Sequence, residues 1–306
     1  MERDMEELVK RIRSLARQKN AIILAHNYQR PEIQDIADLT GDSLELSIKA
    51  SRTDADMIVF CGVHFMAETA AILCPSKKVV LPVVSAGCAM ADMITAEELR
   101  RKKTEHPGVP VVTYVNSGAD VKAESDICCT SANAIQVVRS LDASEVIMTP
   151  DRNLANWVQR HTDKKIHAWP GFCPIHDALT VAAVNEARAA HPRAVLMAHP
   201  ECPLNVLEMA DVVRSTSGML DYAAASDARE FIVATENGLL HTLVKQNPGK
   251  AFYPASPLMV CADMKKTGLF ELFRAIEDEG PVITVPEDIR VRAFQAVERM
   301  LAVPRD

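Results

Sequence analysis

The chain repeats one pattern three times, and this repetition limits its fold more than any other feature. Three segments resemble one another: AIILAHNYQRPEIQDIADLTGDS at 21–43, VPVVTYVNSGADVKAESDICCTS at 109–131 and RAVLMAHPECPLNVLEMADVVRSTS at 193–217. Each segment opens with a short apolar run, and the runs end at His26, Tyr114 and His199. We therefore expect three copies of one structural unit, with these three side chains at equivalent positions.

Further positions recur at matched distances. An aspartate stands twelve residues after each run, and a hydroxyl stands five residues after each aspartate: Asp38, Asp126 and Asp211, then Ser43, Ser131 and Thr216. A later apolar run in each unit ends in a proline, and a cysteine follows that proline within three to seven residues: Cys88, Cys173 and Cys261. Chance similarity among α/β segments is the alternative, but several matched spacings together favour a true repeat.

Each unit alternates strand-like and helix-like segments, in the order strand, loop, helix, strand, helix, strand, with a further helix after the cysteine. Such alternation predicts parallel sheets built from right-handed βαβ units, and continuously apolar runs such as VVTY are typical of buried parallel strands. Pro31 and the Thr95–Glu98 pair indicate helix starts. We predict an α/β fold of three similar parallel-sheet domains, at residues 1–105, 106–190 and 191–306, in a pseudo-threefold arrangement around a central site.

Composition excludes several classes of function. The 306 residues carry 34 Lys and Arg against 41 Asp and Glu, a formal net charge of −7, without the basic stripe of a nucleic-acid binder. No apolar run approaches the roughly 18–20 residues of a membrane span. The charged start, MERDMEELVKRIRSLARQKN, predicts an amphipathic helix and not a secretory signal. We expect a soluble, cytoplasmic protein that binds neither nucleic acid nor membrane.

The three equivalent cysteines predict a metal site. Ligands bind beyond the carboxyl ends of parallel strands, so three units packed around one axis would bring one cysteine each to a common centre. Three thiolates fit a zinc ion with water as fourth ligand or a four-iron cluster with one unsaturated iron, and the residues alone leave both open. The other cysteines read as structural: Cys61, Cys74, Cys128, Cys129 and Cys202.

A set of short motifs resembles one enzyme family. AHNYQ at 25–29, GDSLELS at 41–47, YVNS at 114–117, HPEC at 199–202, TSGM at 216–219 and ATENG at 234–238, together with the three spaced cysteines, resemble quinolinate synthase. No single motif is specific to this family, but the motifs together, in this order, are. The resemblance covers most of the chain, from about Ile22 to Lys266.

The resemblance implies an activity and a cofactor. Quinolinate synthases condense iminoaspartate (iminosuccinate) with dihydroxyacetone phosphate, losing phosphate and two waters, to make quinolinate for NAD biosynthesis. They carry a [4Fe–4S] cluster on one cysteine from each domain, here Cys88, Cys173 and Cys261. Its open iron would act as a Lewis acid on a substrate oxygen. Because the imine hydrolyses readily, transient coupling to the L-aspartate oxidase that produces it is a further expectation.

The resemblance also implies site residues. The substrate-binding positions are His26, Ser43, Tyr114, Asn116, Ser131, His199, Glu201 and Thr216, and Tyr28, Ser215 and His176 are expected in the same cavity. Glu201 is the first choice for general acid and base, against the alternative of a surface carboxylate. His26, His199, Tyr28 and Tyr114 would orient substrate or move protons. The hydroxyls would hold carboxylate or phosphate, although helix capping alone explains many such residues.

Two other functions stay open at this point. A three-cysteine zinc hydrolase or lyase would use the same thiols, and metal analysis with an absorption spectrum separates it from an iron–sulfur protein. A non-catalytic iron–sulfur sensor or electron carrier would change redox state without turnover, but it needs no polar substrate cavity.

Overall fold

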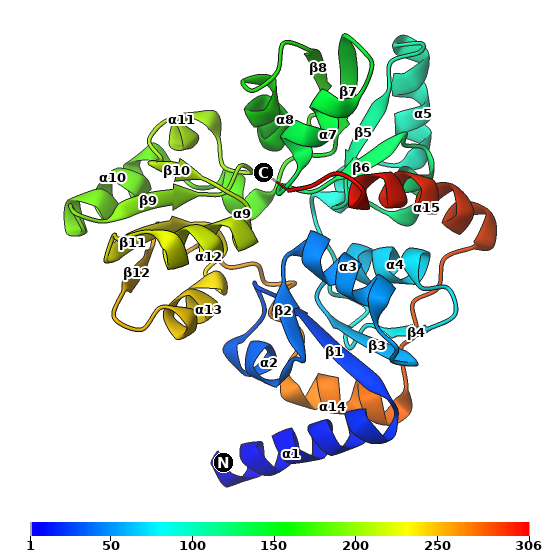
Figure 1. The fold of residues 1–306 in the computed structure, drawn as a ribbon, viewed down its shortest axis with the longest axis vertical. Helices are drawn as coiled ribbons and strands as arrows, with labels where there is room; N and C mark the ends of the chain where they lie inside the picture. Colours follow the sequence, from blue (N-terminus) through cyan, green and yellow to red (C-terminus); the bar gives the residue numbers. More distant parts are fainter. Residues whose placement is uncertain (1, 306) are drawn as a thin grey trace.

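Three four-stranded sheets, all parallel, lie around a common centre (Figure 1). The computed structural model describes residues 2–305. In every sheet the second strand of the unit is at the edge, and the first and third strands form the middle: β2-β1-β3-β4, β6-β5-β7-β8 and β10-β9-β11-β12. The predicted α/β class with three similar parallel sheets is therefore confirmed.

The strands of the three sheets occupy matching stretches of chain. Those of the first sheet are β1 (Ala21–His26), β2 (Leu39–Gly41), β3 (Met57–Cys61) and β4 (Lys78–Val80). Those of the second are β5 (Val111–Tyr114), β6 (Ile127–Cys129), β7 (Glu145–Thr149) and β8 (Lys165–Ala168). Those of the third are β9 (Val195–Ala198), β10 (Val212–Val213), β11 (Glu230–Ala234) and β12 (Ala251–Pro254).

Helices connect and cover these strands. Around the first sheet they are α1 (Glu2–Gln18), α2 (Pro31–Ile36), α3 (Ser43–Arg52) and α4 (His64–Leu73). A 3-10 turn η1 (Ala91–Met93) leads to α5 (Ala96–Glu105), α6 (Ala119–Ala123), α7 (Ala134–Ser140) and α8 (Arg152–Gln159). The remaining helices are α9 (Pro174–Asp177), α10 (Val181–Ala190), α11 (Leu204–Leu207), α12 (Thr216–Ala225), α13 (Leu239–Gln246), α14 (Leu269–Asp278) and α15 (Glu287–Leu301).

The expected helix starts are present, but the predicted number of strands in each unit was wrong. Pro31 is the first residue of α2, and Thr95 and Glu98 form a reciprocal capping box on α5. Sequence analysis predicted three strands for each unit, whereas each sheet has four. The missing strand is the short edge strand, of two or three residues, which is too brief to show an apolar period.

The repeated aspartates have a structural explanation. Asp38 Oδ2 accepts the backbone N–H of Ile23 at 2.7 Å. Asp126 Oδ2 accepts that of Val111 at 2.7 Å, and Asp211 Oδ2 accepts that of Leu196 at 2.8 Å. In each unit the carboxylate thus satisfies a donor on the central strand just before the edge strand begins. The aspartates recur at the same spacing because each unit makes the same hydrogen bond.

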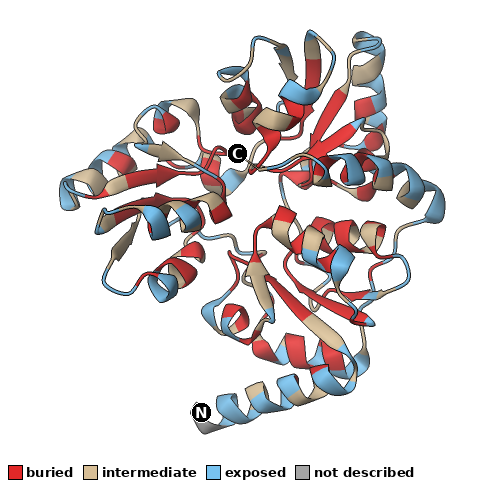
Figure 2. Cartoon of the chain, viewed as in Figure 1, coloured by how far each residue is buried: buried red, intermediate tan, exposed pale blue. Residues whose placement is uncertain are grey.

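The middle strands are buried along most of their length (Figure 2). Successive residues of β1 face opposite sides, as a strand requires. Leu24 belongs to a large apolar cluster that also contains Val112 and Met197 from the other two sheets. Ile23 belongs to a separate cluster with Ile12 of α1 and Leu272 of α14. The inner faces of the three sheets therefore share one continuous core.

The C-terminal helices pack on the first two units. α14 contacts α1 and β3, whereas α15 contacts α4, α6 and β6. Asn133 Nδ2, at the start of α7, donates to the carbonyl oxygens of Met300 at 3.3 Å and Val303 at 3.2 Å. The chain end thereby returns to the middle of the molecule (Figure 1). The three predicted domain ranges stay a prediction.

No helix within residues 2–305 is both long enough and apolar enough to cross a membrane.

Replacing a repeated aspartate should weaken the fold measurably. Asp126→Ala leaves the N–H of Val111 without its acceptor, so we expect a loss of about 1–3 kcal/mol in the free energy of unfolding. Asp126→Asn keeps an acceptor oxygen and should lose about 1 kcal/mol or less. Urea unfolding of the two variants measures the difference. Equal stability of the alanine variant and the wild type would contradict this role of the aspartate.

Candidate active site

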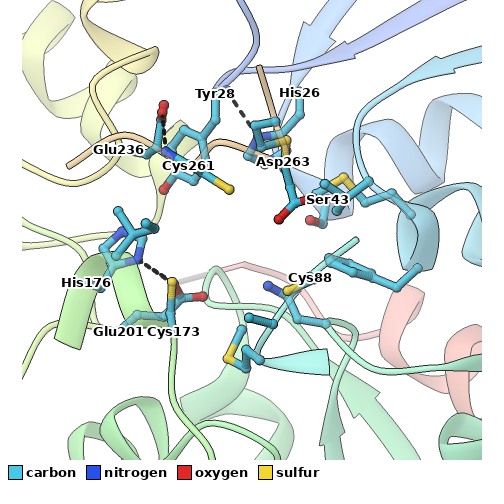
Figure 3. A pocket seen from close by; sticks show the side chains of 18 of the residues that line it. His26, Tyr28, Ser43, Cys88, Cys173, His176, Glu201, Glu236, Cys261 and Asp263 are labelled. Carbon is cyan, nitrogen blue, oxygen red and sulfur yellow. Dashed lines mark hydrogen bonds and ion pairs between the residues drawn. The ribbon is translucent and has the colours of Figure 1, made fainter. Parts of the chain in front are cut away.

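One cavity of about 250 Å³ lies where the three units meet, and side chains from all three units line it (Figure 3). The strand-end residues His26, Tyr114 and His199 all reach it. This placement follows from the topology, because the carboxyl ends of parallel strands share one edge of a sheet. The three sheets present that edge to the same central space.

Three cysteines face the cavity, one from the loop after the last strand of each sheet. Cys88 follows β4, Cys173 follows β8 and precedes α9, and Cys261 follows β12. These three are partly exposed, whereas the other five cysteines are buried: Cys61, Cys74, Cys128, Cys129 and Cys202. Although the residue is partly exposed, desolvation of its sulfur by the surrounding protein raises the pKa of the Cys88 thiol to about 12, so a metal binding here must displace protons.

The spacing of the three sulfur atoms matters for the kind of metal. Among the described residues, one trio of His, Cys, Asp or Glu places all its ligand atoms within 4.8 Å of one another, and it is Cys173, His176 and Glu201. Cys173 belongs to this trio, whereas Cys88 and Cys261 do not. Three thiolates on a single zinc ion, with Zn–S bonds of about 2.3 Å, would stand about 3.8 Å apart.

Buried carboxylates hold two of the cysteine loops. Asp151 Oδ2 accepts the backbone N–H of Cys173 at 3.1 Å, and Glu236 Oε1 accepts that of Cys261 at 3.0 Å. Each acid lies two residues after the third strand of its sheet, β7 or β11. Burial raises the pKa of Asp151 well above its usual value. Neither acid was predicted from the sequence.

The first unit holds its cysteine loop differently. Val63 occupies the position that corresponds to the two acids, two residues after β3. The N–H of Gly87, beside Cys88, instead donates to Asp263 Oδ1 at 3.2 Å. Because Asp263 follows Cys261 by two residues, this bond joins the cysteine loops of the first and third units. Asp263 also lines the cavity and was not predicted.

Two strand-end histidines share one geometry. Nδ1 of His26 accepts the N–H of Tyr28 at 3.1 Å, and Nδ1 of His199 accepts the N–H of Glu201 at 3.3 Å. Both rings are buried, and burial lowers the pKa of each to about 3. The rings are therefore neutral near neutral pH and carry their proton on Nε2. Nε2 of His199 donates to Ser131 Oγ at 3.1 Å.

Glu201 is buried but well supplied with donors. The Tyr114 hydroxyl donates to its Oε1 at 2.7 Å, and His176 Nδ1 lies 2.8 Å from its Oε2. Burial alone would raise the pKa of this carboxyl, but His176, His199 and Tyr114 together hold the pKa below its ordinary value. Glu201 is thus an ionised carboxylate in the cavity wall, which excludes the alternative of a surface carboxylate.

Thr235 was also missed, although it lies within the ATENG motif. Its Oγ1 is 2.5 Å from the Tyr28 hydroxyl and 2.8 Å from His176 Nε2. Burial raises the pKa of Tyr28 well above its usual value, so the phenol stays protonated. Thr235 therefore connects side chains from two distant parts of the chain across the cavity.

The predicted hydroxyls separate into two groups. Ser43 and Thr216 are the first residues of α3 and α12, and both line the cavity with Ser131 and Asn116. The buried Oδ1 atom of Asn116 has no hydrogen-bond partner among the residues that the structure describes. Ser215 differs, because its Oγ caps α12 by accepting the N–H of Gly218 at 3.2 Å, and it is not among the residues that line the cavity.

Acid should destabilise the fold through the two neutral histidines. A ring with a pKa of about 3 when folded and about 6.5 when unfolded binds its proton only in the unfolded state between these values. Stability is then full above about pH 6.5 and falls by roughly 2 kcal/mol per ring on going to about pH 5. In urea unfolding of the metal-free chain, His26→Asn or His199→Asn should reduce this loss. A loss as large as that of the wild type would show that the ring does not titrate this way.

Comparison with known proteins is consistent with this arrangement. The family described as quinolinate synthetase A protein matches residues 10–302. A quinolinate synthase of Geobacter sp. (strain M21) is 55% identical over 301 residues, which is 98% of this chain and 99% of the relative. Quinolinate synthase 1 of Methanosarcina acetivorans is 55% identical over 97% of this chain and 98% of its own. The chain therefore belongs to the quinolinate synthase family of enzymes.

Proposed function

We propose that this enzyme condenses iminoaspartate with dihydroxyacetone phosphate to form quinolinate, with loss of phosphate and two waters, on a [4Fe–4S] cluster held by Cys88, Cys173 and Cys261. The observation that carries the proposal is the meeting of three partly exposed cysteines, one from each unit, with a buried ionised carboxylate in one cavity. The product would enter NAD biosynthesis.

The donor set fits a cluster better than a single ion. Thiolates are the usual ligands of iron–sulfur clusters, and no fourth cysteine lines the cavity within the described part of the chain. Cys88 and Cys261 lie outside the one compact group of candidate ligands among the described residues, and a cluster spreads its thiolates over several irons, whereas one zinc ion would draw them together. This arrangement favours the cluster over the three-cysteine zinc enzyme. When bound, the cluster supplies one iron without a protein thiolate, a Lewis acid for a substrate oxygen.

The polar wall of the cavity suits anionic substrates. Ser43 and Thr216 begin ten-residue helices, and the start of such a helix offers free N–H groups and a partial positive charge. Asn116, whose amide oxygen has no partner among the described residues, can both donate and accept hydrogen bonds. The neutral ring of His26, with its proton on Nε2, lines the same cavity, whereas Nε2 of His199 is already bonded to Ser131 Oγ. These donors would bind the carboxylates and phosphate and orient the two substrates.

Glu201 is the group best placed to move protons. The condensation needs a base to remove a proton from carbon and an acid to protonate a leaving hydroxyl. As an ionised carboxylate beside Tyr114 and His176, Glu201 can accept the first proton and return it in the second step. Tyr114 and His176 then act as positioning residues, because their hydrogen bonds fix both carboxylate oxygens.

Each of the three cysteines should be needed for both cofactor and product. Cys88→Ser, Cys173→Ser or Cys261→Ser should lose the brown colour, the bound iron and sulfide, and quinolinate formation, because oxygen replaces a soft ligand. Anaerobic iron and sulfide analysis, with an assay on iminoaspartate and dihydroxyacetone phosphate, measures this. Cys74→Ser is a matched control, since the Cys74 thiol donates to Ala50 O at 3.1 Å in the core and a hydroxyl can do the same. Retained cluster and activity in any of the three variants would remove that cysteine from the proposal.

Replacing Glu201 by its amide should separate binding from turnover. Glu201→Gln keeps the shape of the side chain but cannot accept a proton, so kcat should fall by about 10²–10⁴-fold while substrate still binds. Steady-state kinetics and a binding measurement on the cluster-loaded variant test this. Turnover close to that of the wild type would exclude Glu201 as the acid and base.

A further inference from the structure

We propose that the chain without its cluster binds a single divalent ion of the zinc type on Cys173, His176 and Glu201. This site shares one ligand with the three-cysteine set and is otherwise distinct from it. The proposal concerns the metal-binding state of the cluster-free protein and needs no assumption about the substrate.

The geometry of the trio is close to that of a metal site. His176 Nδ1 lies 3.1 Å from Cys173 Sγ and 2.8 Å from Glu201 Oε2, and all three ligand atoms fall within 4.8 Å. Ligand atoms bound to tetrahedral zinc at about 2.0–2.3 Å stand about 3.3–3.8 Å from one another. Side-chain shifts of roughly one ångström or less would therefore admit an ion among them.

The chemical types of the three ligands favour a metal ion of intermediate softness, such as zinc. Thiolate, imidazole and carboxylate are the three ligand types that zinc uses, and three protein ligands leave a fourth position for water. Magnesium and calcium prefer oxygen ligands. The thiolate and the carboxylate together would neutralise a divalent cation. Binding displaces the thiol proton of Cys173 to solvent.

Each ligand also has a partner that orients it. When an ion takes Nδ1 of His176 in place of the hydrogen bond to Glu201, the ring can carry its proton on Nε2, which lies 2.8 Å from Thr235 Oγ1 as the acceptor. Tyr114 donates to the carboxylate oxygen that the ion would leave unused, Oε1 of Glu201. Cys173 is held through its N–H by Asp151. His176 and Glu201 are 1% and 3% exposed, so these two ligands are held in fixed positions in the cavity wall, while Cys173 is partly exposed and gives an ion access.

Local structure brings two of the ligands together without help from other units. Cys173 is the N-cap of α9, and His176 lies in its first turn, so residues three apart in sequence face the same side. Cys88 and Cys261, in contrast, come from loops of other units. Glu201, from the third unit, completes the trio, whose three ligand atoms lie within 4.8 Å of one another in the chain without metal.

Cobalt titration of the cluster-free full-length chain tests the site. Under anaerobic conditions Co²⁺ stands in for Zn²⁺, and its thiolate charge-transfer absorption reports sulfur ligation. We expect one Co²⁺ per chain, displaced by Zn²⁺. Affinity should fall at least about tenfold in Cys173→Ser, His176→Ala and Glu201→Gln. Cys88→Ser and Cys261→Ser should bind as the wild type does. Far-UV circular dichroism checks that each variant is folded.

Three outcomes would overturn the proposal. The first is no saturable Co²⁺ uptake by the wild type. The second is unchanged binding by folded His176→Ala, since the ring would then not be a ligand. The third is equal loss in Cys88→Ser or Cys261→Ser, which would assign the ion to the three cysteines. None of these results depends on quinolinate formation, so failure here and failure of the proposed function are distinguishable.

A consequence for cofactor loading rests on the proposed function. Because zinc and cluster would both use Cys173, Zn²⁺ bound to the trio should block cluster reconstitution in the wild type. His176→Ala removes a zinc ligand but no proposed cluster ligand, so it should take up iron and sulfide in the presence of Zn²⁺. Equal inhibition of both proteins by Zn²⁺ would contradict the competition.

Discussion

The structure depends on one constraint, which is that three parallel sheets direct the carboxyl ends of their strands at the same small space. A parallel strand places its last side chain and the following loop at one edge of its sheet. Three copies of one unit therefore bring equivalent side chains to the same central space. The units are joined there by side chains as well as by the shared apolar core. Ser217 donates to Glu45 Oε2 at 2.6 Å, linking the third unit to the first. The cavity is thus an interface that exists only when all three units are in place.

Burying so many polar groups is costly unless each finds a partner. The centre meets much of this requirement by giving Glu201, Asp151 and Glu236 specific donors. Glu201 receives the Tyr114 hydroxyl, and Asp151 receives the N–H of Cys173. Glu236 accepts from Cys261 N and pairs with Lys265 Nζ at 3.0 Å. These same partners fix the cysteine loops and the carboxylate of Glu201. The hydrogen bonds that offset the cost of burying these polar groups therefore also fix the side chains that a cofactor and substrates would contact.

The repeat in the sequence predicted the positions of residues within each unit, but it did not predict the contacts between units. Strand ends such as His26 were predictable because apolar runs and matched spacings mark them. Asp151 and Glu236 were not, since Val63 breaks the three-way match at their position. The contact of His176 with Glu201 joins segments from different units, and no local period encodes it. The packing of α14 on α1 was hidden for the same reason. The domain ranges, the cytoplasmic location and coupling to L-aspartate oxidase stay predictions.

The central claim is that one thiol from each unit binds a shared cluster and leaves one metal position free of protein. Anomalous diffraction at the iron edge, on anaerobically grown crystals of the loaded enzyme, tests this most directly. We expect one compact group of iron atoms in the cavity, bound by Cys88, Cys173 and Cys261, with the remaining iron facing the polar wall that includes Glu201. A single metal ion in place of the group, or a protein side chain on the remaining iron, would contradict the account.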